Sequence, residues 1–152
     1  MPEVASSLAP LRKTVVVPLE QSRAFELFTA RFGEWWPLAT HSMGLADAAL
    51  VRFPREVGGP IIETMRDGST CVWGTVTTWE PPVAVCFTWH PGHPESSAGD
   101  IEVRFGPDGA GATVVTLTHS GWERRADGAR ARLGYDSGWE AVLGAFGAAA
   151  AT

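Results

Sequence analysis

The sequence predicts an α+β protein in which one antiparallel β-sheet packs against a long C-terminal helix. In the middle of the chain, short runs rich in Val, Ile, Thr and Trp alternate with Pro, Gly and Asp turn signals. This pattern is typical of consecutive antiparallel strands and not of β-α-β crossovers. In the last stretch Trp139, Val142, Leu143 and Phe146 lie at i, i+3, i+4 and i+7, which is one face of an α-helix.

The chain is predicted to form a single domain at residues 12–152 after a flexible segment at residues 1–11, which is polar, small and Pro-containing. With 152 residues, of which 45% are hydrophobic and 19% charged, the composition suits one globular unit with its own core. The β-branched run at 13–17 predicts the first strand, which ends before Pro18.

A helix is expected over residues 20–31, because Phe25, Phe28 and Phe32 recur at i, i+3 and i+7. Residues 34–37 predict a short second helix or turn that ends before the proline.

Six further strands are expected after a loop at residues 38–48, and a Pro- and Gly-rich loop at 90–100 interrupts them. The predicted strands are 50–54, 60–65, 71–79, 83–90, 101–105 and 112–119. Asp67-Gly68 supplies a hairpin signal between the second and third of these.

The C-terminal helix is predicted to run from 135 to 151. Ser137 and Glu140 have the spacing of a capping box, which favours a start near residue 135. Gly144 and Gly147 each cost about 1 kcal/mol relative to alanine inside a helix. Their expected benefit is room, either for close approach to the sheet or for a space that a side chain would fill.

Charge and composition exclude several classes of function. The net charge of −5 and the scattered arginines disfavour nucleic-acid binding. No apolar run approaches the roughly 20 residues that a membrane-spanning helix needs, and no signal peptide is evident. Cys71 and Cys86 are the two cysteines of the chain and have no metal-ligand spacing, so they are expected to be reduced core or near-core thiols of a cytoplasmic protein.

No catalytic signature or cofactor motif is present, and no cofactor is expected. His90, His93, Glu95 and Asp100 could suggest a metal site, but a Pro- and Gly-rich loop rarely holds ligands in fixed geometry, so no metal is predicted. A buried carboxylic acid stays open as a catalytic group, since the sequence does not place the available glutamates inward. The candidates are Glu63 and Glu80.

Several segments, taken in order, resemble the START-like helix-grip (SRPBCC) superfamily, and within it the proteins similar to the C-terminal domain of the activator of Hsp90 ATPase. The segments are VVVPLEQSRAFELFT, GTVTTWEPP, FTW, ATVVTLTHSGW and GWEAVLGAF. The resemblance covers residues 12–150 and implies a curved sheet of six to seven strands wrapped around the C-terminal helix, with a cavity between them.

The resemblance also implies a function. Members of the superfamily bind hydrophobic or amphipathic small molecules, and some are cyclases or hydroxylase components. The co-chaperone activity of the eukaryotic relative involves an additional N-terminal domain that this chain lacks, so an Hsp90-type partner is a weaker expectation.

Strand periodicity and the resemblance together indicate which side chains reach the cavity. Because Val115 and Leu117 face inward, His119 is expected inward too. The direction of the row from Trp73 to Trp79 stays open, since it depends on the strand register. The predicted ligand-binding residues are Trp35, Trp36, His41, Met43, Trp73, Phe87, Trp89, His119, Trp139, Leu143 and Phe146.

Three functions are compared. The favoured one is non-catalytic binding of a hydrophobic or amphipathic small molecule, with His119 as the first choice of polar contact and a Trp N–H as the second. An enzyme acting on an aromatic or polyketide-like substrate is the first alternative, and a co-chaperone-like interaction domain is the second. The identity of the ligand and a homodimer through a strand edge stay open.

Overall fold

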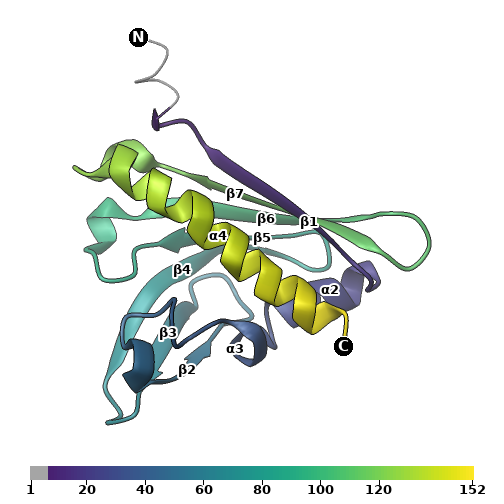
Figure 1. Cartoon of the computed structure of the whole chain (residues 1–152), viewed down its shortest axis with the longest axis horizontal. Helices are drawn as coiled ribbons and strands as arrows, with labels where there is room; N and C mark the ends of the chain where they lie inside the picture. Colours follow the sequence, from purple (N-terminus) through teal and green to yellow (C-terminus); the bar gives the residue numbers. More distant parts are fainter. Residues whose placement is uncertain (1–6) are drawn as a thin grey trace.

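The computed structural model describes residues 7–152, which form one seven-stranded sheet and a long helix across one of its faces (Figure 1). Residues 1–6 of the segment expected to be flexible lie outside the described residues. The strands are β1 (Leu11–Val17), β2 (Ala48–Arg52), β3 (Pro60–Met65), β4 (Thr70–Glu80), β5 (Ala84–Trp89), β6 (Gly99–Pro107) and β7 (Thr113–Ser120). The helices are α2 (Gln21–Phe28), α3 (Phe32–Trp35) and α4 (Gly128–Ala150), with 3-10 turns η1 (Leu45–Asp47), η2 (Glu95–Ser97) and η3 (Trp122–Arg124).

The sheet has the order β1-β7-β6-β5-β4-β3-β2, and all its neighbouring strands are antiparallel. The first strand therefore returns to pair with the last, with Val15 opposite Val115. In Figure 1, α4 runs across the sheet from η3 to the side where α2 lies. The predicted α+β helix-grip fold is confirmed, and all seven predicted strands agree with the observed ones to within two residues at either end.

Alternation of buried and partly exposed residues gives the sheet one buried face. In β7 the buried residues are Thr113, Val115, Leu117 and His119, and the residues between them are partly exposed. A strand places successive side chains on opposite faces, so these four point toward α4. The predicted inward direction of His119 is confirmed, since only 2% of it is exposed.

Strand β4 departs from strict alternation, because register shifts occur next to Ile61 in β3 and next to Val76 in β4. An extra residue moves the following side chains to the other face. Trp73 is therefore buried, whereas Thr77 is exposed. At Gly74 the neighbouring strand comes so close that a Cβ atom would lie 1.8 Å from the carbonyl oxygen of Thr88.

The helix predicted over 20–31 is shorter than expected and ends at Phe28. Thr29 donates both its N–H and its hydroxyl to the carbonyl of Phe25, which closes the last turn. Phe32 therefore belongs to the separate short helix α3, but it remains buried, and its ring lies 5.9 Å from that of Phe28. The predicted buried stripe is correct, and the single continuous helix is wrong.

The start predicted for the C-terminal helix is also wrong, because α4 begins at Gly128. Glycine fits closely at this start, since a Cβ atom at Gly128 would lie 2.0 Å from the carbonyl oxygen of Trp122. Ser137 lies inside the helix and donates to the carbonyl of Gly134, and Glu140 accepts from Lys13 of β1 at 2.8 Å. The predicted capping box does not form, whereas the predicted apolar face is buried against the sheet.

Two other features bear on the class of protein. None of the helices formed by residues 7–152 is long and apolar enough to cross a membrane. Cys71 and Cys86 are both partly buried, and they are not joined in a disulfide.

Candidate ligand-binding pocket

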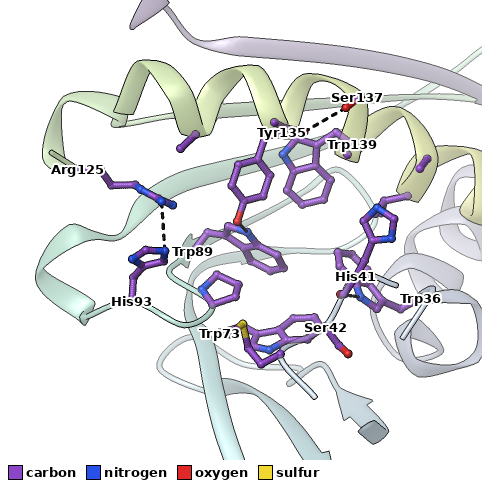
Figure 2. Close-up of a pocket in the computed structure, with 17 residues that line it drawn as sticks. Trp36, His41, Ser42, Trp73, Trp89, His93, Arg125, Tyr135, Ser137 and Trp139 are labelled. Atoms are coloured by element: carbon purple, nitrogen blue, oxygen red, sulfur yellow. Dashed lines mark hydrogen bonds between the residues drawn. The ribbon is translucent and has the colours of Figure 1, made fainter. Parts of the chain in front are cut away.

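A pocket of about 680 Å³ lies between α4, the facing ends of β4 and β5, and the segment 36–43 (Figure 2). Six of the eleven side chains predicted to bind a ligand are on its wall. They are Trp36, His41, Met43, Trp73, Trp89 and Trp139.

The structure places the other five predicted residues behind this wall, in the core. Trp35 turns away from the pocket, donates its indole N–H to the carbonyl of Leu27 and packs against Phe146, with 5.1 Å between ring centroids. The buried residues that are not on the pocket wall are Trp35, Phe87, His119, Leu143 and Phe146.

Four tryptophans form one continuous aromatic surface, which we call the tryptophan wall (Trp36, Trp73, Trp89 and Trp139). Neighbouring ring centroids are 5.3 Å apart for Trp36 and Trp73, and 5.5 Å apart both for Trp73 and Trp89 and for Trp89 and Trp139. None of the four is more than 7% exposed. Rings packed this tightly have little freedom to move, so the surface that they offer a ligand is preformed.

Each indole N–H of the tryptophan wall is donated to a protein acceptor, so the wall offers a ligand ring faces and edges but no free donor. The four pairs are Trp36 with the carbonyl of His41 at 2.7 Å, Trp73 with Glu63 Oε1 at 2.9 Å, Trp89 with Tyr135 Oη at 3.1 Å, and Trp139 with His119 Nδ1 at 3.0 Å. The Trp N–H considered from the sequence as a polar contact is therefore already occupied.

Glu63 is a fully buried carboxylate that joins two parts of the pocket wall, the segment at Met43 and the indole of Trp73, through hydrogen bonds. Its Oε1 accepts the N–H of Met43 and the indole N–H of Trp73, and its Oε2 accepts the N–H of Gly44, each at 2.9 Å. Burial by itself raises the pKa of Glu63, but these hydrogen bonds outweigh it and hold the pKa below the ordinary 4.5. The sequence contained a signal for this position, since Glu63 lies two residues from Ile61 on one strand face.

His119 lies directly behind the tryptophan wall and fixes Trp139 by accepting its indole N–H. The imidazole is also packed against Trp122, with 4.0 Å between ring centroids, and against Tyr135, with 5.0 Å. Burial, together with the nearby charge of Arg125, lowers the pKa of His119 to about 3. It is a neutral structural acceptor at physiological pH, not a group in contact with the pocket.

A titration of the histidines checks this assignment. We expect the nuclear magnetic resonance signals of the His119 ring to stay those of the neutral form as the pH falls from 7 to about 4. Protonation would create a positive charge that is buried away from water, which is unfavourable. The unfolded chain takes up this proton near 6.5, so the free energy of unfolding falls as the pH drops from 6.5 toward 3. Protonation of His119 near pH 6.5 in the folded protein would contradict the assignment.

The ionisable side chains of the pocket lie at its two ends and at one point between them. Figure 2 shows Arg125 and His93 at one end and His41 at the other, with the hydroxyl of Tyr135 directed toward Trp89. Arg125 Nη2 and His93 Nε2 are 3.2 Å apart. Tyr135 and Arg125 are pocket residues that were not predicted from the sequence, although Tyr135 precedes Trp139 by four residues and so shares its side of the helix.

The helix side of the pocket is built from small residues. Ala131, Gly134, Gly138 and Ala141 recur every three or four residues along α4 and all border the pocket. A Cβ atom added at Gly134 or Gly138 would meet no other atom within 4 Å. The room expected from Gly144 and Gly147 is therefore found at Gly138 and Gly134, about two and three turns before Gly144.

A curved antiparallel sheet that holds a C-terminal helix over an aromatic pocket defines a protein of the helix-grip class. The model of the family described as Activator of Hsp90 ATPase homolog 1-like protein matches residues 19–151. The chain therefore belongs to this family, and the resemblance stated from the sequence is confirmed.

Solved structures agree with this assignment. The anthrahydroquino-γ-pyrone synthase Txn09 is 34% identical to the chain, with 81% of this chain and 83% of that chain covered and a TM-score of 0.59. CalC, a self-sacrificing resistance protein from Micromonospora echinospora, is 24% identical over 95% of each chain, with a TM-score of 0.67. PFC0360w, an HSP90 activator from Plasmodium falciparum, is 19% identical over 74% of this chain and 72% of that one, with a TM-score of 0.53. The last two show the fold alone. No curated protein matches the chain.

Proposed function

We propose that the chain binds a flat, largely apolar aromatic molecule of the polyketide type in the pocket between α4 and the tryptophan wall. The observation that carries this proposal is the open volume of about 680 Å³, bounded by aromatic rings on one side and by small helix residues on the other. Small-molecule sites commonly have volumes of roughly 300–1,000 Å³ and apolar walls with a few polar groups.

The walls suit a planar ring system better than a flexible chain. A ligand ring can lie against the indole faces, which contributes about 0.5–1.5 kcal/mol per aromatic pair beyond the burial of apolar area. Because the wall is preformed and rigid, little conformational entropy is lost when a rigid ligand binds. The similarity to Txn09, a synthase of an anthrahydroquino-γ-pyrone, supports an aromatic polyketide as the ligand class.

Binding of 2-(hydroxymethyl)anthraquinone, followed by the quenching of tryptophan fluorescence and by calorimetry, tests the proposal. We expect saturable binding at one site with a Kd of about 10–100 μM, as suits a ligand of this size. Quenching should be strong, because the tryptophan wall borders the ligand. Absence of saturable binding in both measurements would overturn the proposal.

Catalysis of ring closure on such a ligand is a second candidate, and the 34% identity to Txn09 favours it. The side chains of His41 and Tyr135 border the pocket and are of the types that act in general acid–base catalysis. Incubation with an open precursor of an anthrahydroquino-γ-pyrone, followed by chromatography of the product, separates this candidate from binding alone. A co-chaperone-like role would use an exposed apolar patch and not an interior space. The pocket of about 680 Å³ favours small-molecule binding instead.

A further inference from the structure

We propose that the hydroxyl of Tyr135 donates a hydrogen bond to a carbonyl or phenolate oxygen of the ligand, and so selects oxygenated aromatic molecules over aromatic hydrocarbons. This inference rests on the proposed function, because it names the group in the pocket that recognises the ligand. It concerns the single tyrosine of the chain.

The ring of Tyr135 is held in one position by three aromatic neighbours. Its centroid lies 5.0 Å from that of His119, 5.6 Å from that of Trp122 and 5.9 Å from that of Trp139, to which it is nearly parallel. The hydroxyl reaches the pocket beside Trp89 (Figure 2). A donor held in this way binds a ligand oxygen without first losing side-chain entropy.

The hydrogen bond that Tyr135 already makes leaves its proton available. Its Oη accepts the indole N–H of Trp89 at 3.1 Å, and within residues 7–152 this is the hydroxyl's one hydrogen-bond partner. An indole N–H is a donor only, so the tyrosine O–H does not point to it. Burial raises the pKa of Tyr135, so the hydroxyl keeps its proton and acts as a donor at physiological pH.

The other two hydroxyls on the pocket wall are already used as donors. Ser42 Oγ donates to the carbonyl of Leu38 at 2.5 Å, and Ser137 Oγ donates to the carbonyl of Gly134 at 3.3 Å. Tyr135 is therefore the pocket hydroxyl that has a proton to offer a ligand. For this reason we assign the selection of oxygenated ligands to the hydroxyl of Tyr135.

Arg125 borders the same pocket, and its positive charge acts on the Tyr135 side chain, so the pocket favours a ligand oxygen with partial negative charge. Its Nε and Nη2 donate to Asp127 at 2.8 Å and 2.9 Å, so Nη1 is the guanidinium nitrogen that these two bonds do not use. A cation and a neutral O–H donor that border one pocket favour a carbonyl or phenolate oxygen over a second donor. The ligand class is thus a planar aromatic molecule with such an oxygen near the first turns of α4.

Two probes of similar shape test the inference. 2-(Hydroxymethyl)anthraquinone has two ring carbonyl oxygens, and 2-(hydroxymethyl)anthracene lacks both. We expect the wild-type chain to bind the quinone more tightly. Tyr135→Phe should weaken quinone binding about fivefold to tenfold, the effect of one hydrogen bond. Binding of the anthracene probe should change by less than about twofold, since it offers no oxygen at that position.

Tyr135→Phe also leaves the indole N–H of Trp89 without its acceptor, and the anthracene probe controls for any resulting distortion. Thr77→Ala is the control variant, because it removes an exposed hydroxyl that does not border the pocket, and both probes should bind it as they bind the wild type. Equal loss for both probes in Tyr135→Phe, or no loss for the quinone, would overturn the role of Tyr135 while leaving the proposed function intact. Failure of both probes to bind the wild type would overturn the proposed function and this inference with it.

Discussion

Replacing Glu63 by glutamine is expected to lower the free energy of unfolding by about 3 kcal/mol at pH 7. Glutamine keeps the shape of the side chain, but one oxygen becomes an NH₂ group, which cannot accept a hydrogen bond. At least one of the three N–H groups that converge on Glu63 would then be buried without an acceptor. Chemical denaturation of both proteins measures the difference.

The pH dependence of this difference has a definite sign. The pKa of Glu63 in the folded protein lies below its ordinary value of 4.5, so the stability that the ionised carboxylate contributes is complete above pH 4.5. It is lost as the pH falls through the folded pKa. The gap in unfolding free energy between wild type and Glu63→Gln should therefore narrow as the solution is made more acidic than pH 4.5.

Glu56→Gln is the control for this experiment, because Glu56 is an exposed carboxylate in the turn before β3. Surface substitutions of this kind usually change stability by less than about 0.5 kcal/mol. If Glu63→Gln were as stable as Glu56→Gln at pH 7, the carboxylate would not be the group that holds Met43, Gly44 and Trp73 in place.

Gly138→Leu is expected to make the protein more stable and at the same time a weaker binder. Leucine is favoured over glycine in a helix, so the free energy of unfolding should rise by about 0.5–1 kcal/mol. The new side chain would start where no atom lies within 4 Å and where α4 borders the pocket. Filling this space should weaken the binding of 2-(hydroxymethyl)anthraquinone about 10-fold to 100-fold.

Gly144→Leu is the matched control, since Gly144 lies in the same helix, is exposed and also has no atom within 4 Å of an added Cβ, but does not border the pocket. It should show the same gain in stability with unchanged binding. Thermal denaturation and calorimetry on both variants provide the comparison. Equal affinity of Gly138→Leu and Gly144→Leu would mean that the ligand does not occupy this pocket.

The strands were predicted to within two residues because their signals are local. β-Branched runs, alternation and turn residues lie next to one another in the sequence, and antiparallel neighbours are joined by short connections. The row from Trp73 to Trp79 could not be assigned to a face, because the register shifts near Ile61 and Val76 depend on partner strands.

The candidate site was predicted in part for the same reason. Alternation in β5 and the apolar face of the last helix pointed to Trp89 and Trp139, both of which border the pocket. Adjacent residues Trp35 and Trp36 could not be separated, since both are buried and only the packing of α3 turns one toward the pocket and the other toward Phe146. Arg125 and Tyr135 were missed because they lie at or before the expected start of the helix.

The sequence by itself determined the α+β class, the order of the elements, the buried face of the last helix and the inward direction of His119, since these follow from periodicity along one segment. Only the tertiary structure decided that α4 begins at Gly128, that Glu63 is a buried acceptor, and that an open space lies beside Gly134 and Gly138. The physical reason is that the hydrogen bonds of a buried carboxylate and the volume of a pocket depend on groups from separate elements of the fold, and that the helix start lies where the chain packs against the preceding turn.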